Sequence, residues 1–135
     1  MSAVVLPTRV YLEDTDAQGI VYNASYFRFM ERARTEWLRA RGVEHDELRA
    51  EHGVVLVLSA IEAEFRSAAR LSDMLYVTAD VAEIRGARVR FAQSVRRGEP
   101  EGEVICDGTA EVACVGALDG RPRRVPATLM SEWKQ

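Results

Sequence analysis

The spacing of the apolar residues is helical in one long segment of the chain, residues 25–41. The apolar side chains there recur every three or four positions, so on a helix they would form a stripe about 100° wide. Arginine and threonine side chains would occupy the opposite side, and Gly42 suits the position just past a helix end. The segment predicts one amphipathic helix with an apolar stripe of Tyr26, Phe29, Met30, Ala33, Trp37 and Ala40.

From Val54 onward, apolar and polar residues alternate with a period of two, as they do in strands with one buried face. Residues 4–12, rich in β-branched side chains, predict a first strand. Gly86 in RGAR and the GEPEG segment at 98–102 predict hairpin turns, so the later strands would form an antiparallel meander. Residues 44–52 and 125–133 fit a short second helix and a terminal helical turn. The expected apolar face includes Val57, Ser59, Ile61, Ala63, Phe65, Leu75, Val77, Ala79, Val81, Val89, Phe91, Val95, Val104, Cys106, Ala110 and Val112.

These elements together predict an α+β fold. One long helix and about five antiparallel strands would pack with the apolar face of the sheet closed over the helix. A chain of 135 residues fits a single domain, 1–135. Because one helix covers only part of such a sheet and a strand edge remains open, we expect a homo-oligomer.

Charge and composition argue against several classes of protein. A net charge of −3 does not suit a general nucleic-acid binder, which usually carries a strong basic excess. No apolar run approaches the roughly 18 residues of a membrane span, and the N-terminal MSAVVLPT lacks the basic and apolar regions of a signal peptide. Cys106 and Cys114 have no metal-ligand spacing, and their even separation in one strand predicts two buried thiols. We therefore expect a cytoplasmic protein that binds no metal.

The residue types suited to chemistry are concentrated in EDTDAQGIVYNASY, residues 13–26. A structural explanation exists: Asp favours turns, Gly19 supplies a positive φ, and Asn23 or Ser25 would cap the following helix. A calcium loop starting at Asp14 does not fit, since Gln and Ser stand where the ion needs further ligands. The turn explanation leaves unexplained why a carboxylate stands just before an apolar, aromatic helix start.

The same arrangement suits acyl transfer. The N-terminus of a helix offers unpaired backbone N–H groups and a partial positive charge, which would stabilise an oxyanion developing on a substrate carbonyl. Asp16, on the loop before the helix, would approach that carbonyl as a nucleophile or through an activated water. A site of this kind needs neither a metal ion nor a cofactor.

The beginning of the chain resembles that of the YbgC-type acyl-CoA thioesterases, in the 4-hydroxybenzoyl-CoA thioesterase branch of the hotdog-fold superfamily. It reads RVYLEDTDAQGIVYNASYFRFMERARTEWLRARG, where the family pattern is close to R-V-Y-x-E-D-T-D-x-x-G-x-V-Y-H-A-S-Y followed by E-R-A-R-T-E. The likeness continues through ARLSDML, IRGAR and RPRRVPATL and covers nearly the whole chain. It implies a hotdog fold, homodimers or homotetramers with active sites at the subunit interface, and hydrolysis of a short-chain or aromatic acyl-CoA without a cofactor.

The resemblance also assigns roles to positions of this sequence. Asp16, the second aspartate of the motif, is the catalytic carboxylate. The backbone N–H of Asn23 polarises the thioester carbonyl, and Tyr22 lines the acyl pocket. Glu13 and Asp14 match the motif without a catalytic role, and we interpret them as loop and strand-end residues. Asn23 departs from the pattern, because many relatives carry His there, so only its backbone donor is carried over.

Coenzyme A carries phosphates, so basic residues are expected at the mouth of the site. The candidates lie near predicted strand ends: Arg66, Arg70, Arg85 and Arg88. His45 and His52 lie in a different segment from the motif, and we interpret them as solvated helix residues.

Two other functions stay open at this point. A non-catalytic adaptor that kept the fold would bind acyl carrier protein or the Tol-Pal and phospholipid-synthesis machinery, to which relatives are linked. A hotdog dehydratase would need a catalytic histidine, which this motif region lacks. The intact Asp16 favours the thioesterase.

Overall fold

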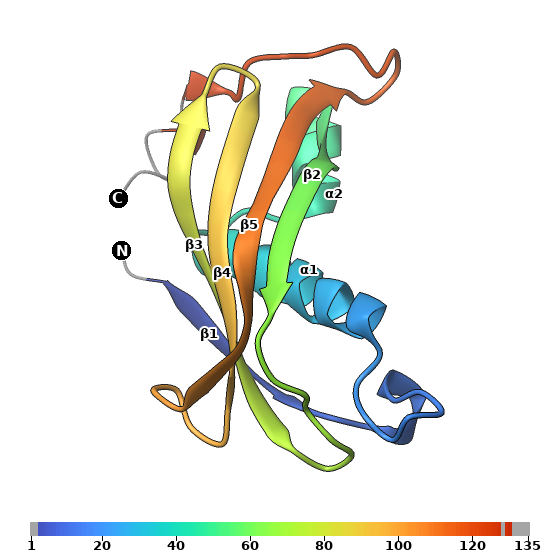
Figure 1. Ribbon diagram of the computed structural model, residues 1–135. Helices are drawn as coiled ribbons and strands as arrows, with labels where there is room; N and C mark the ends of the chain where they lie inside the picture. The colour runs from blue at the N-terminus through green and yellow to red at the C-terminus, as the bar shows by residue number, and fades with distance from the viewer. Residues whose placement is uncertain (1–2, 128, 131–135) are drawn as a thin grey trace.

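A computed structural model describes residues 3–127, 129 and 130 of the chain (Figure 1). One long helix lies against one face of a five-stranded antiparallel sheet, and the sheet curves over the helix. This is the α+β hotdog arrangement that the sequence predicted. The helix is α1 (Asn23–Ala40), and the strands are β1 (Val4–Arg9), β2 (Val54–Phe65), β3 (Met74–Arg85), β4 (Arg88–Arg97) and β5 (Glu103–Gly116).

The helix forms where the apolar stripe predicted it, and it begins two residues earlier than expected. Five of the six stripe residues are buried in the core, whereas Ala40 is exposed at the helix end. Gly42 has a φ of 77° just past the C-cap, as expected of a residue in the left-handed region. The segment after it forms two short helical pieces, α2 (His45–Glu47) and η2 (Leu48–His52), in place of the one short helix predicted there.

The strand order is β1-β3-β4-β5-β2. The last three strands form the predicted meander, because Gly86 and the segment 98–102 both turn hairpins. β2 precedes them in the chain but does not join beside β3. It crosses to the far edge of the sheet and pairs with β5, while β1 pairs with β3. The two edge strands are therefore β1 and β2.

Three β-bulges interrupt the period of two, and two of them contradict the alternation expected from the sequence. Ser59 is the extra residue between Leu58 and Ala60 in β2, so Val57 and Ile61 lie on opposite faces of the sheet. A bulge at Ile105 in β5 likewise separates Val104 from the face of Cys106. Strict alternation cannot reveal a bulge, because one extra residue shifts every following side chain to the other face. The third bulge lies between Val81 and Glu83 in β3.

The two ends of the chain differ from the prediction in different ways. β1 stops at Arg9, short of the predicted residue 12, and a 3-10 helix, η1 (Leu12–Asp14), follows it. Of the predicted terminal turn at 125–133, residues 127, 129 and 130 are helical, and residues 128 and 131–133 lie outside the described part. No helix among the described residues is long and apolar enough to cross a membrane.

Candidate active site

The loop between η1 and α1 is a narrow hairpin closed by main-chain hydrogen bonds. Thr15 and Val21 pair as an antiparallel bridge, and the N–H of Asp16 donates to the carbonyl of Ile20 at 2.9 Å. The turn at its tip closes with the N–H of Gly19 donating to the carbonyl of Asp16 at 3.0 Å. Gly19 has a φ of 81°, as the turn explanation of this segment predicted.

Asp16 is half-buried at the start of this turn, and its side chain serves the turn with one oxygen only. Its Oδ1 accepts the N–H of Gln18 at 2.8 Å, the local hydrogen bond typical of Asp in turns. Its Oδ2 accepts no hydrogen bond from any described residue. The prediction that this carboxylate stabilises a turn is therefore confirmed, and the turn leaves one of its two oxygens without a hydrogen bond from the described residues.

The N-terminus of α1 begins directly after the loop and has no side-chain cap. The N-cap residue is Tyr22, and its side chain makes no capping hydrogen bond. The prediction that Asn23 or Ser25 caps the helix is wrong, because Asn23 is the first helical residue and Ser25 Oγ donates to the carbonyl of Asp14 at 3.1 Å. In the described part of the chain, the N–H groups of Asn23 and Ala24 donate to no protein oxygen.

Asp14 is not the strand-end residue that the sequence suggested. It ends η1 and is 5% exposed. Its Oδ2 accepts the N–H of Tyr11 at 2.9 Å, and its Oδ1 accepts Nη2 of Arg28 at 3.1 Å. Both carboxylate oxygens are thus engaged inside the protein, and Asp14 would have to leave one of these partners to bind calcium as the first ligand of a loop. No three His, Cys, Asp or Glu side chains converge as metal ligands among the described residues.

The connection between β2 and β3 packs against the same loop. The N–H of Val21 donates to the carbonyl of Ala69 at 2.9 Å, and Ile20 pairs with Arg70 as an isolated bridge. Ala69 also contacts α1, because its N–H donates to the hydroxyl of Tyr26 at 3.2 Å. Burial raises the pKa of Tyr26, although this hydrogen bond acts in the opposite direction. Arg70 is thereby brought beside the loop that carries Asp16.

The four arginines predicted to bind coenzyme A divide into two pairs. Arg66 and Arg70 lie in the connection next to the Asp16 loop, whereas Arg85 and Arg88 flank the hairpin at the opposite end of β3. An extended strand of this length spans roughly 35 Å, so one protomer cannot bring both pairs to one nucleotide. Ion pairs also engage two of the four: Arg66 with Glu64 and Asp107, and Arg88 with Glu111.

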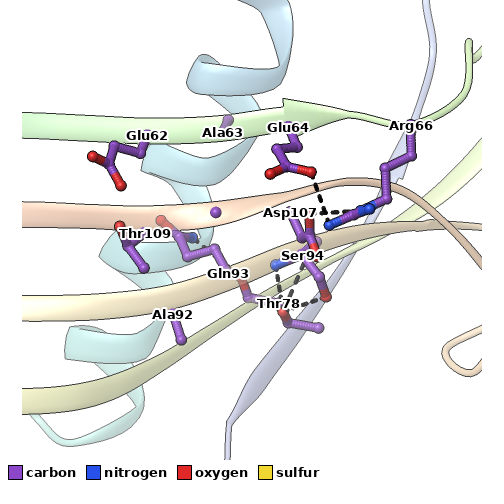
Figure 2. A pocket seen from close by; sticks show the side chains of 11 residues that line it. Glu62, Ala63, Glu64, Arg66, Thr78, Ala92, Gln93, Ser94, Asp107 and Thr109 are labelled. Atoms are coloured by element: carbon purple, nitrogen blue, oxygen red, sulfur yellow. Dashed lines mark hydrogen bonds and ion pairs between the residues drawn. The ribbon is translucent and has the colours of Figure 1, made fainter.

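A hollow of about 690 Å³ lies on the face of the sheet away from α1, and it does not contain the predicted catalytic residues. Figure 2 shows Arg66 at one end of it, turned toward Glu64 and Asp107. Small side chains form its floor. Neither Asp16, Tyr22 nor Asn23 lines it. Asn23 and Tyr22 are instead exposed on the surface of the protomer, with Tyr22 at 56%.

The two histidines lie away from the loop. His45 is exposed and borders a small hollow with Arg34 and Leu38, in the second half of α1. His52 is exposed at the end of η2. Both positions agree with their interpretation as solvated helix residues.

Sequence reasoning missed the contacts that Asp14, Ser25 and Arg28 make with one another. The three-residue spacing of Ser25 and Arg28 on one helix face was a usable signal for their contact. No local pattern indicated that Asp14 would be buried beneath them.

Chemically, a carboxylate with one uncommitted oxygen lies on the hairpin that leads into a helix start, where two N–H donors have no acceptor among the described residues. The N–H of Tyr22 donates to the carbonyl of Asp14 at 2.9 Å and joins the two sides. The donors suit an oxygen that becomes negative, and the carboxylate suits attack on the adjacent carbon or activation of a water. Acyl transfer is one reaction that groups of these two kinds can serve.

Known proteins resemble this chain over nearly its whole length. A family model described as the thioesterase-like superfamily matches residues 10–133. The chain is 40% identical over 129 residues to the acyl-CoA thioester hydrolase YbgC of Escherichia coli O6:H1, covering 96% of this chain and 94% of that protein.

Solved structures show the same fold. A probable thioesterase from Bartonella henselae has a TM-score of 0.86 at 30% identity, covering 93% of this chain and 100% of that chain. A 1,4-dihydroxy-2-naphthoyl-CoA thioesterase from Synechocystis has a TM-score of 0.89 at 17% identity, covering 99% and 97%. The chain belongs to the thioesterase-like superfamily, as a hotdog-fold member of the YbgC type.

Proposed function

We propose that this protein hydrolyses acyl-CoA thioesters to a free acid and coenzyme A, with Asp16 and the N-terminus of α1 as its reaction centre. One observation carries the proposal: Asp16 keeps an uncommitted carboxylate oxygen on a hairpin hydrogen-bonded to a helix start whose first N–H groups are unpaired. The name of the related YbgC protein, an acyl-CoA thioester hydrolase, supports the same substrate class.

The reaction follows from these groups. The thioester oxygen accepts the N–H of Asn23, which makes the carbonyl carbon more electrophilic and stabilises the negative charge that develops on the oxygen. Asp16 either takes a proton from a water that attacks this carbon, or attacks it directly to form an anhydride that water then hydrolyses. In both cases the carbon–sulfur bond breaks, the thiolate of coenzyme A leaves and takes up a proton, and the acid is released.

The acyl group is proposed to lie against Tyr22. Its ring is exposed in the protomer and directly precedes the donor at Asn23. A flat aromatic surface at this place suits a short or aromatic acyl chain, the class we propose as substrate.

The site is proposed to be completed in a homo-oligomer. β2 is a twelve-residue edge strand whose outer side pairs with no described strand, and it exposes Val57, Leu58 and Phe65 at 43–48%. An apolar edge of this length favours pairing with a second copy. A second copy would also be needed for Arg85 or Arg88 to reach the nucleotide bound near Arg70. Light scattering at micromolar concentration measures the assembly, and a stable, active monomer would contradict it.

The central experiment compares two carboxylates of the same loop. Asp16→Asn keeps the size of the side chain but removes its charge, and we expect kcat to fall at least about a hundredfold across a panel of acyl-CoA chain lengths. Glu13→Gln is the matched control, because Glu13 is exposed and makes no hydrogen bond or ion pair with the described residues.

Near wild-type turnover by folded Asp16→Asn would remove the basis of the proposal. A wild-type protein without hydrolase activity on the whole panel would favour the adaptor function, since an adaptor needs no free carboxylate oxygen.

A further inference from the structure

We propose that Asp14 and Arg28 are positioning residues for the reaction, which together hold the loop of Asp16 in place against the N-terminus of α1. The inference rests on the proposed function above. It concerns two residues outside the reacting groups, and we refer to them as the Asp14–Arg28 clamp.

The carboxylate of Asp14 connects the chain before the loop to the helix after it. Oδ2 accepts the N–H of Tyr11 at 2.9 Å, and Oδ1 accepts Nη2 of Arg28 at 3.1 Å. Only 5% of Asp14 is exposed, so these partners, and not water, satisfy its carboxylate oxygens. A buried carboxylate that loses its partner is strongly unfavourable, so the arrangement permits few alternatives.

The main chain of Asp14 continues the same connection. Its carbonyl accepts both the N–H of Tyr22 at 2.9 Å and Oγ of Ser25 at 3.1 Å. Nη2 of Arg28 also donates to Oγ of Ser25 at 3.1 Å, which closes the network inside the first two turns of α1. Asp14 thus contacts the entry to the loop, the exit from it and the helix start.

This network determines the relative position of the two reacting groups. Asp16 is two residues beyond Asp14 in the chain, and Asn23 directly follows Tyr22. The hydrogen bond from Tyr22 to Asp14 therefore holds the backbone that leads to Asp16 against the backbone that leads to the helix donor. Displacements of about 1 Å in such a geometry can reduce rates by two orders of magnitude.

A contribution to folding stability does not by itself explain an arginine at position 28. Its guanidinium reaches back to Ser25 in the first turn of α1, the end of a helix where the macrodipole disfavours a cation. The side chain of Arg28 is 54% exposed, so water screens part of its attraction to the Asp14 carboxylate, which is 7% exposed. Holding Asp14 in place accounts for the arginine better.

The test uses Asp14→Asn, Asp14→Ala, Arg28→Ala and Arg28→Lys in the full chain. The matched controls are Glu13→Gln, from the same 3-10 turn, and Arg32→Ala, one helical turn beyond Arg28 on the exposed side. For each variant we would measure the melting temperature, kcat and KM with one acyl-CoA, and the inhibition constant of free coenzyme A.

We expect Asp14→Ala and Arg28→Ala to lower kcat roughly tenfold to hundredfold, with KM and the inhibition constant within about twofold of wild type. The double variant should be no slower than the slower single variant, since both changes break one contact. Arg28→Lys should recover part of kcat. Both controls should match wild type.

A second readout does not depend on turnover. In Asp14→Ala, the amides of Asp16 and Tyr22 should exchange hydrogen faster, because the loop they close becomes looser, while amides in the middle of β4 keep their protection. A merely structural role predicts a lower melting temperature with unchanged kcat in the folded protein, and this result would overturn the inference.

The outcomes separate this inference from the proposed function. If Asp16→Asn is inactive but the folded Asp14 and Arg28 variants turn over like wild type, only the clamp is wrong. If Asp16→Asn also keeps the wild-type rate, the proposed function itself fails. Should Asp14→Ala not fold, the isosteric Asp14→Asn and the surface variants of Arg28 decide the question.

Discussion

Arg34 of α1 and Gln93 of β4 form a buried polar pair between the helix and the sheet. Nη1 of Arg34 donates to Oε1 of Gln93 at 2.9 Å, and Nε2 of Gln93 donates to the carbonyls of Met30 at 3.0 Å and Thr78 at 3.1 Å. One glutamine therefore connects the helix to two strands. Burial lowers the pKa of Arg34, and the nearby Glu31 partly offsets this effect.

Gln93→Met should destabilise the protein by roughly 2–3 kcal/mol, because it leaves the buried Arg34 guanidinium without its Gln93 acceptor and removes the two hydrogen bonds to the Met30 and Thr78 carbonyls. Urea unfolding followed by circular dichroism measures the change. Ser94→Ala is the control on the same strand and should have a smaller effect, since Ser94 is only half-buried. Equal stabilities of Gln93→Met and wild type would show that the pair is dispensable.

Variants of Asn23 distinguish a role of its backbone N–H in catalysis from a role of its side chain. Asn23→Ala should keep most activity and stability, because the side chain caps nothing. Asn23→Pro removes the N–H and should lower kcat about a hundredfold, an effect of ~3 kcal/mol. Proline suits this site: position 23 is the first of the helix, and Tyr22 has φ −66° and ψ 136°, which a following proline favours.

Steady-state kinetics on variants shown to be folded and able to bind coenzyme A would decide this point. Unchanged turnover in Asn23→Pro would exclude the backbone donor, and loss of turnover in Asn23→Ala would instead make the amide side chain a participant. Asn23→His restores the residue common in relatives and should alter the rate or its pH dependence only if an imidazole contributes here.

The arginines near the loop should affect substrate binding more than turnover. Arg70→Ala should raise KM for acyl-CoA more than Arg66→Ala does, because Arg66 is already paired with Glu64 and Asp107 whereas Arg70 has no ion pair among the described residues. KM should also increase with salt, since phosphate contacts at a surface are screened. Arg49→Ala, at an exposed residue of η2, is the control.

Arg85→Ala and Arg88→Ala should raise KM only if a second copy places that hairpin near the loop. A KM that is independent of salt and unchanged in Arg66→Ala and Arg70→Ala would place the nucleotide elsewhere.

The thiol of Cys106 should be unreactive in the folded protein. Burial, with a further contribution from Asp107, raises its pKa to about 11. The unfolded thiol ionises near the ordinary value of 9.0, so the folded state holds this proton more tightly, and stability is lost as the pH rises from about 9 through 11. Urea midpoints at pH 8 and pH 10.5 measure the loss, which should be smaller in Cys106→Ala.

A thiol reagent at pH 8 should label both cysteines only after unfolding, because burial also raises the pKa of Cys114. Rapid labelling of native Cys106 would contradict its burial in β5.

The sequence by itself determined the elements whose periodicity is local. The apolar stripe of α1 is set by residues three and four apart, and the hairpins at Gly86 and at 98–102 are set by turn residues. The position of Asp16 in a turn before a helix was also readable, because Asp and Gly favour such turns through contacts with their own neighbours. These features need no distant part of the chain.

Only the tertiary structure decided the features that depend on residues far apart in sequence. The burial of Asp14 beneath Arg28, the crossing of β2 to β5 and the pairing of Arg34 with Gln93 all join segments that no local period connects. Gly108 shows the reason most clearly: a Cβ there would stand 1.9 Å from the carbonyl oxygen of Glu62, on a different strand. Packing between segments that are distant in sequence sets such contacts, so the pattern of apolar and polar residues along the chain cannot predict them.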